Sequence, residues 1–159
     1  MIFGPADPAR SVPAEHLLST ARAAAAAAGV TRLADVTRLD RIGLPVWQAV
    51  RPMSRALSVH QGKGATVPDA QLGALLEAVE SDAAERFDGE GPRCAFAARP
   101  ESARPPTIAD FADDRDRSPP ENEAVRWVEA ESLVGGGPAF LPFDLVSLDL
   151  TRDVPSPFD

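Results

Sequence analysis

The chain has 159 residues, 44% of them hydrophobic, and a formal net charge of −8. This length and apolar content are typical of one soluble domain with its own core. The negative charge argues against a surface for nucleic acid or an anionic membrane, because clustered Lys and Arg bind both. The lone cysteine, Cys94, excludes an internal disulfide and a Cys-rich zinc site.

Targeting signals and metal-binding histidine pairs are also missing from the sequence. No apolar run approaches the roughly 20 residues that span a bilayer. The opening MIFGPADPAR has neither the basic nor the apolar region of a signal peptide. His16 and His60 are far apart and lack the spacing of metal ligands. We therefore expect a cytoplasmic protein that does not enter membranes.

The first predicted element is a helix from Val12 to Ala28. Ser11 can cap it, Pro13 is tolerated in its first turn, and Gly29 ends it. The alanine run inside it favours plain helix, because alanine has the highest helix propensity. The segment from Val30 to Leu39 is short and mixed, and we interpret it as a strand with a loop.

Two strands are predicted next, Leu44–Val50 and Ala56–His60. Both are rich in β-branched or aromatic residues, and Arg51-Pro52 breaks the chain between them. The sequence QGKG, Gln61–Gly64, is interpreted as the turn that leaves the second strand. It lacks the length and the Ser or Thr of a P-loop, so no Walker-type phosphate site follows from it.

The clearest predicted helix runs from Val67 to Arg86. Thr66 and Asp69 have the spacing of a capping pair, and Pro68 stands in the first turn. Apolar residues at helical spacing predict its buried stripe. These residues are Leu72, Leu75, Leu76, Val79 and Ala83.

The rest of the chain is predicted to hold three strands and a long polar loop. The strands are Arg93–Ala98, Ala124–Glu129 and Ala139–Leu150. Pro100–Asn122 is a Pro-, Asp- and Arg-rich loop around a short helix at Ile108–Phe111. Strands interleaved with helices predict a layered α/β or α+β fold, which we expect to be a mixed sheet with helices packed on it.

Glu77 and Glu80 are the candidate residues for a functional site. They are three apart on the clearest helix, so both carboxylates point the same way, at the edge of the apolar stripe. Gly73 precedes them by one turn and, having no side chain, is expected to leave open space beside them. Spacing alone is also satisfied by two ordinary solvated acids.

The helix as a whole is acidic, and only Arg86 balances it. Like charges at helical spacing destabilise one another unless a cation neutralises them. Mg²⁺ bound by one or two carboxylates would do so. An arginine from elsewhere, Arg51 or Arg55, would serve equally well, so the residues alone leave both alternatives open.

The run from Thr31 to Glu80 resembles the opening signature of YcaO proteins of the TfuA-associated type. The matching pieces are ADVT, LDRIGLPV, AVRP, SRALSV, QGKG and LLEAVE, about fifty residues in register. Looser similarity continues at Trp127–Ala130 and at Leu141-Pro142. This register is far more specific than any of the motifs alone.

The resemblance implies an ATP- and Mg²⁺-binding α/β fold without a P-loop. It implies that Glu77 and Glu80 ligate Mg²⁺ and that Arg10 contributes to the nucleotide site. By the same resemblance, the nucleotide site includes Gly62, Lys63, Gly64 and Gly73. Enzymes of this family phosphorylate an amide oxygen and let a nucleophile attack the carbon, which gives azolines, thioamides or amidines.

Several features depart from the family pattern. Gly73 and Leu17 stand where the family often has hydroxyl residues near the nucleotide. No catalytic residue can be named, and Cys94, in a strand predicted to be buried, is expected to be inert. YcaO proteins are more than twice as long as this chain, and their later half supplies Asn, Glu and basic residues of the site.

We therefore interpret residues 1–159 as the amino-terminal half of a YcaO-like domain. Its predicted parts are 1–29, an N-terminal helix region; 30–98, core strands with the glutamate helix; 99–123, a polar loop; and 124–159, terminal strands. The expected partners are a peptide or protein substrate, a TfuA-like protein or a complementing C-terminal half, and a second copy in a homo-oligomer. The alternatives are a non-catalytic binding module and the remnant of a broken gene.

Overall fold

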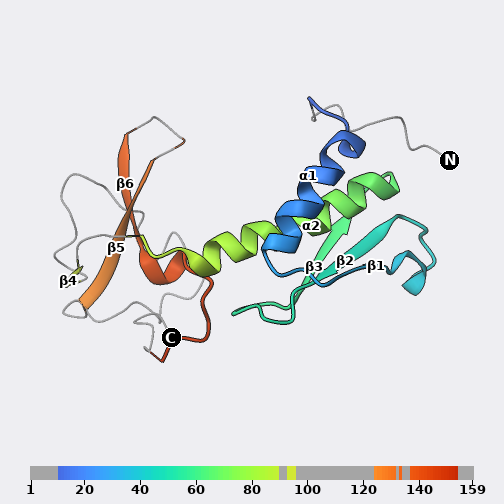
Figure 1. Ribbon diagram of the computed structural model, residues 1–159. Coiled ribbons are helices and arrows are strands. Elements are labelled where there is room, and N and C mark those ends of the chain that lie inside the picture. The colour runs from blue at the N-terminus through green and yellow to red at the C-terminus, as the bar shows by residue number, and fades with distance from the viewer. Residues whose placement is uncertain (1–10, 90–92, 96–123, 132, 134–136, 154–159) are drawn as a thin grey trace. The chain divides into compact units, whose positions relative to one another are not determined.

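The computed structural model describes residues 11–89, 93–95, 124–131, 133 and 137–153 (Figure 1). They belong to two compact units, Met1–Glu85 and Arg86–Asp159. Each unit combines helical turns with a small antiparallel sheet, so the expected layered α/β class is confirmed. The described strands form two three-stranded sheets where the sequence suggested one mixed sheet. The connections within each sheet join antiparallel neighbours, which need no helical crossover.

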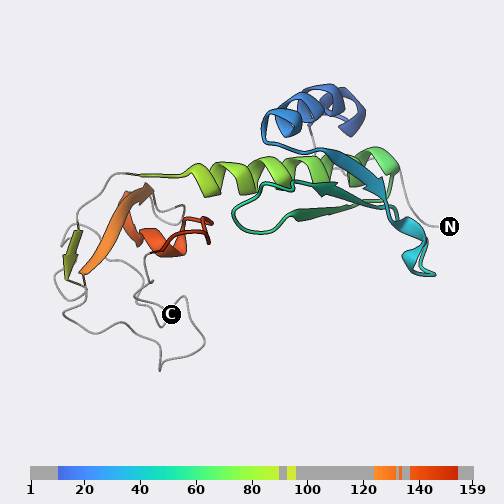
Figure 2. The same ribbon diagram turned by 60° about the horizontal axis from the view of Figure 1, so that its bottom comes forward.

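The first unit packs two helices with one sheet of order β1-β2-β3. Figure 2 shows the long helix α2 lying along the strands of this sheet. Because Leu33 packs against both buried clusters of the unit, α1 and α2 share the sheet face on which Leu33 lies. The elements are α1 (Ala14–Ala27), β1 (Arg32–Asp35), the 3₁₀ turn η1 (Thr37–Leu39), β2 (Val46–Val50), β3 (Val59–Lys63) and α2 (Val67–Arg86).

Helix α1 agrees closely with the predicted helix, but its first residue is preceded by Pro13, not capped by Ser11. Pro13 occupies the cap position and provides no side-chain hydrogen bond, so the predicted Ser11 cap is wrong. Gly29 has φ +86°, a left-handed conformation that ends the helix as predicted. The mixed segment after it contains a strand and a 3₁₀ turn, as expected.

Strand β3 begins and ends later than the sequence predicted. Residues Gln61 to Lys63 belong to the strand, so the interpretation of QGKG as a turn is wrong. The ladder continues even to Gly64, whose N–H donates to the carbonyl oxygen of Pro45 at 3.2 Å. Glycine has a low strand propensity. It nevertheless stands in β3 because the backbone of α2 packs too closely on Gly62 for any side chain.

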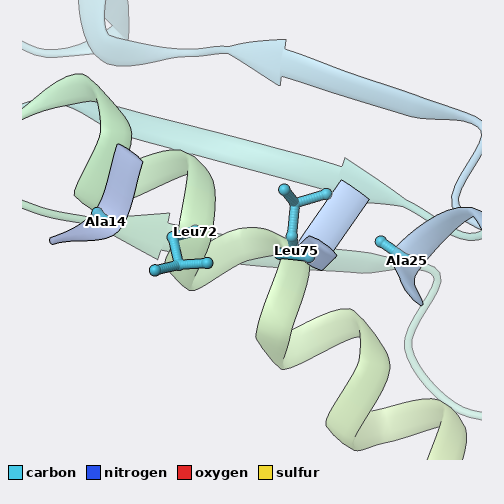
Figure 3. Close-up of a cluster of buried hydrophobic side chains, with 5 residues drawn as sticks. Ala14, Ala25, Leu72 and Leu75 are labelled. Atoms are coloured by element: carbon cyan, nitrogen blue, oxygen red, sulfur yellow. The ribbon is translucent and has the colours of Figure 1, made fainter. Parts of the chain in front are cut away.

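The predicted start of α2 is confirmed by its capping contacts. The Thr66 hydroxyl donates to Asp69 at 2.6 Å and accepts the Asp69 N–H at 3.3 Å. Leu72 and Leu75 are buried against α1, between Ala14 and Ala25 (Figure 3).

Val79 also packs against this cluster, as predicted, but two members of the predicted apolar stripe on α2 are wrong. Leu76 is 45% exposed and Ala83 is also exposed. Small residues, not large ones, face the sheet, because the helix lies too close for a leucine. These are Ala70, Ala74 and Ala78, each fully buried.

The second unit contains a sheet of order β4-β5-β6. Trp127 and Phe143 are its largest buried side chains, and the Arg126 guanidinium lies 4.0 Å from the centre of the Phe143 ring. The strand predicted over Ala139–Leu150 ends at Pro142, where the chain enters a 3₁₀ turn. The elements are β4 (Arg93–Ala95), β5 (Ala124–Glu131), β6 (Pro138–Pro142) and the 3₁₀ turn η4 (Phe143–Leu145).

Three predictions lie outside the described residues: the polar loop Pro100–Asn122, its short helix Ile108–Phe111, and the environment of Arg10. In the part of the chain that the structure describes, no helix is long and apolar enough to cross a membrane.

Candidate functional site

The candidate site is built on a close backbone contact between α2 and β3, which we call the glycine contact and define by Gly62, Ala70 and Ala74. A Cβ atom on Gly62 would fall far inside contact distance of the Ala70 carbonyl oxygen and the Ala74 backbone nitrogen. Both are main-chain atoms of a regular helix and cannot rotate away. Only glycine at position 62 allows this approach.

The neighbouring glycines belong to the same close approach. A Cβ on Gly64 would lie 2.9 Å from the backbone nitrogen of Ala70. A Cβ on Gly73 would lie 3.3 Å from the Cα of Gly62, tight but within reach of a small shift. The prediction of open space at Gly73 is wrong, because the backbone of β3 fills it.

Glu77 and Glu80 continue the helical row of Gly73, one and two turns further along α2. Both side chains are exposed. Neither forms a hydrogen bond or an ion pair with another residue in the described ranges. The two carboxylates therefore face solvent from one side of the helix, with their oxygens available to a ligand.

The Lys63 side chain is not brought together with these carboxylates. Gly62 is buried beneath α2 and Lys63 is exposed, and successive side chains of a strand point to opposite faces. The side chain of Lys63 therefore leaves the sheet on the face away from α2. Its backbone nitrogen is closer, 3.9 Å from the position of a Cβ on Gly73.

Two other acids of α2 form ion pairs with Arg51, which follows β2. The Arg51 guanidinium donates to Asp82 at 2.7 Å and to both oxygens of Glu85 at 3.0 and 3.1 Å. Its Nε donates to the Ala28 carbonyl at 2.8 Å, which ties the end of α1 to the same group. The alternative that an arginine compensates the acidic helix is thus correct for Asp82 and Glu85, whereas Glu77 and Glu80 have no such partner among the residues that the structure describes.

The Glu85 carboxylate is buried with its partners. Burial alone would raise its pKa, but hydrogen bonds from Arg51 and from the Ser54 hydroxyl outweigh burial and lower the pKa to about 2. This carboxylate is therefore a permanent anion that fixes the helix and is not free to bind a metal.

His60 is a buried residue that the sequence analysis did not select. It lies on the same face of β3 as Gly62, and its Nε2 has no hydrogen-bond partner among the described atoms. Burial and the nearby Arg51 cation lower the pKa of His60, while the Glu77 carboxylate acts in the opposite direction. If the strand had been predicted to extend through Gly62, the alternation of side chains along it would have placed His60 on the face beneath α2.

Mg²⁺ is compatible with the donors that Glu77 and Glu80 offer. In the described part of the chain, no three His, Cys, Asp or Glu side chains gather closely enough to form a complete metal cage. Mg²⁺ in nucleotide sites is held by one or two carboxylates, phosphate oxygens and waters, so two unpaired carboxylates are sufficient from this helix.

Leu17, which stands where the family often has a hydroxyl residue, is exposed on α1. Cys94, the lone cysteine, lies in strand β4.

Comparison with known proteins identifies the family. Residues 61–158 match the model of the family described as YcaO cyclodehydratase, ATP- and Mg²⁺-binding. The chain resembles YcaO from Methanopyrus kandleri, solved with AMPPCP and Mg²⁺, with a TM-score of 0.61 and 26% identity over 87% of this chain and 34% of that chain. The chain belongs to the YcaO family.

Sequence relatives support the same assignment. An uncharacterised protein of Methanothermobacter thermautotrophicus is 36% identical over 130 residues, 74% of this chain and 30% of that protein. A protein encoded in the tfuA 3′ region of Rhizobium leguminosarum bv. trifolii is 34% identical over 135 residues, 82% of this chain and 31% of that protein. The chain thus spans about a third of the length of the relatives it matches.

Proposed function

We propose that this chain provides the Mg²⁺- and ATP-binding part of a YcaO enzyme, with Glu77 and Glu80 as the metal ligands. The observation that supports the proposal is selective pairing on one helix. Asp82 and Glu85 are ion-paired with Arg51, whereas Glu77 and Glu80 are exposed and unpaired within the described residues. The description of the family and the AMPPCP and Mg²⁺ in the Methanopyrus structure agree with this role.

In this function the chain positions two carboxylates. The Arg51 ion pairs fix α2 near its end, and the glycine contact fixes it against β3, so the two ligands are preorganised. A bound Mg²⁺ would neutralise the triphosphate and polarise the phosphoryl group that is transferred. Exposure of both carboxylates leaves room for phosphate oxygens and waters to complete the coordination.

The proposed reaction of the complete protein is phosphorylation of a peptide backbone amide oxygen. The γ-phosphoryl group of ATP would pass to that oxygen with release of ADP. Attack of a nucleophile on the activated carbon and expulsion of inorganic phosphate, which takes the amide oxygen with it, would then give an azoline, thioamide or amidine. The substrate is a peptide or protein. Arg10 and Lys63 remain proposed contributors to the nucleotide site, and Gly62, Gly64 and Gly73 would shape it through the backbone. The cytoplasm is the proposed location, and a homo-oligomer the proposed assembly.

A TfuA-like protein is the proposed partner. The support for it is the genomic position of the Rhizobium relative, which is encoded in the tfuA 3′ region. A complementing C-terminal half would provide the remaining Asn, Glu and basic groups of the site. Either partner would act on a site whose carboxylates are already in place on α2.

The proposal is tested by phosphate release from ATP, measured with the full-length protein and its partner. Glu77→Gln and Glu80→Gln should each reduce turnover by about 100-fold, because each removes a charged Mg²⁺ ligand without changing shape. Glu15→Gln, at an exposed acid of α1, is the matched control and should leave turnover unchanged. Turnover that is the same in all four proteins would exclude the metal role, and absent turnover in the wild type would favour a non-catalytic binding module.

A further inference from the structure

Helix α2 and strand β3 meet backbone to backbone at the glycine contact. The Ala70 and Ala74 main chain lies over Gly62 so closely that no Cβ fits between them. Ala74 and Ala78 continue this thin layer toward β2, where they pack on Ala49. The distance between helix and sheet is therefore set by the smallest available side chains.

The carboxylate pair is rigidly connected to this contact. Gly73, whose Cβ position lies 3.3 Å from the Cα of Gly62, begins the helical row that Glu77 and Glu80 continue. A regular helix moves as one body over two turns. Any change in the distance at Gly62 is therefore passed on to the two carboxylates.

The free edge of β3 offers hydrogen-bond donors beside that row. Arg51 N–H donates to Ser58, and Gly64 N–H donates to Pro45, so these are hydrogen-bonded pairs of the antiparallel ladder. By alternation, Gly62 bonds to β2, and the backbone N–H of Lys63 points away from β2. Within the described sheet β3 is an edge strand, so this N–H and, by the same alternation, that of Gln61 face outward.

The Lys63 nitrogen lies next to Gly73. Because Gly64 meets Ala70 whereas Gly62 meets Ala74, α2 runs antiparallel to β3, and Gln61 is the nearer of the two to Glu77.

We propose that Gly62 is a positioning residue that fixes the distance of Glu77 and Glu80 from the outward N–H groups of Gln61 and Lys63, so that the carboxylates and these donors act on the same Mg²⁺-nucleotide. This inference rests on the proposed function. It gives the QGKG sequence a role different from a flexible phosphate loop: its first glycine sets the spacing, and its glutamine and lysine contribute backbone donors.

The test compares two substitutions of the same chemical type in the full-length protein. Ala74→Ser adds one oxygen to the layer between α2 and β2–β3, and Ala25→Ser adds the same atom between α1 and α2. Both positions are almost fully buried helical alanines. Gly62→Ala is the direct variant, and Ala74→Ser decides the result if Gly62→Ala does not fold. Thermal midpoints are recorded with the dissociation constant for Mg²⁺ and AMPPCP.

The two alanine variants should lose similar thermal stability, because each buries one extra hydroxyl. Of these two variants, only Ala74→Ser should weaken nucleotide binding, by about 10-fold. The added oxygen would shift α2 from β3 by a fraction of an ångström, which misplaces the two carboxylates relative to the backbone donors of β3. Gly62→Ala should weaken binding further.

Equal affinities for Ala74→Ser and Ala25→Ser would overturn the inference. The proposed function has a separate criterion: it fails if Glu77→Gln with Glu80→Gln leaves the dissociation constant unchanged. If the glutamate variant loses binding and Ala74→Ser does not, the function stands and the positioning role of Gly62 is wrong.

Discussion

Arg51 and Glu85 form a buried two-pronged ion pair, with Nη1 3.1 Å from Oε1 and Nη2 3.0 Å from Oε2. The two side chains are 4% and 3% exposed. They connect the segment after β2 to the last turn of α2. Because the same arginine also binds the Ala28 carbonyl, one cation links both helices to the sheet.

Removal of the Arg51 charge is expected to destabilise the protein strongly. Arg51→Met would leave the Glu85 carboxylate buried without its main partner, which typically costs about 3–5 kcal/mol. Urea unfolding followed by circular dichroism measures the change. The double variant Arg51→Met with Glu85→Met should recover much of the loss, since both charges are then gone. A loss below about 1 kcal/mol for the single variant would contradict the ion pair as described.

The same pair predicts acid sensitivity. The pKa of Glu85 is about 2 in the folded protein, below its ordinary value of 4.5, so the unfolded chain takes up the proton first as the pH falls. Stability is therefore fully present above pH 4.5 and is lost as the pH falls toward 2. Unfolding curves between these pH values should show a steeper decline for the wild type than for Glu85→Gln. Parallel declines would argue against a depressed pKa.

His60 predicts a second pH dependence, nearer neutrality. Its pKa is lowered in the folded protein from an ordinary value of 6.5, so the unfolded state binds the proton first. Stability should fall as the pH drops below 6.5, and the fall should be smaller in His60→Phe. Thermal midpoints at several pH values between 7.5 and 5.5 provide the comparison, with the exposed His16→Phe as the control. A His16 variant that removes the dependence instead would contradict this assignment.

Gly29 predicts a purely conformational effect. Its φ is +86°, and no atom lies within 4 Å of the position of an added Cβ. Gly29→Ala should therefore cost about 1 kcal/mol of unfolding free energy through the left-handed backbone alone. Gly29→Asn should cost less, because asparagine tolerates this conformation better. Equal stability of the alanine variant and the wild type in urea would show that the turn adopts another conformation.

Local signals in the sequence were enough to predict α1 and α2 and most of their ends, the Ser11 cap of α1 being the exception. Thr66 and Asp69 form the capping contacts that their spacing indicates, and Gly29 ends α1 in the expected conformation. These features depend on neighbours within a few residues, which a sequence shows directly. The same local reasoning identified the two exposed glutamates, which are three residues apart on α2.

Contacts between elements that are distant in the sequence could not be predicted from the sequence. QGKG was interpreted as a turn because glycine breaks strands. Gly62 nevertheless stands in a strand, because the backbone of Ala70 and Ala74, eight and twelve residues later, lies against it. Leu76 was placed in the core by its spacing, and it is exposed because α2 turns a row of alanines toward the sheet. Arg51 and Arg55 were equal candidates for compensating the acidic helix, and only the fold shows that Arg51 pairs with Asp82 and Glu85.

The central claim is that Glu77 and Glu80 hold the Mg²⁺ of a bound nucleotide. Calorimetric titration of the full-length protein with AMPPCP, with and without Mg²⁺, tests it most directly. Binding should require Mg²⁺ in the wild type and in Glu15→Gln. Glu77→Gln with Glu80→Gln should weaken it by about 100-fold or more while the thermal midpoint stays close to that of the wild type. A dissociation constant that is unchanged in the double variant would contradict the claim.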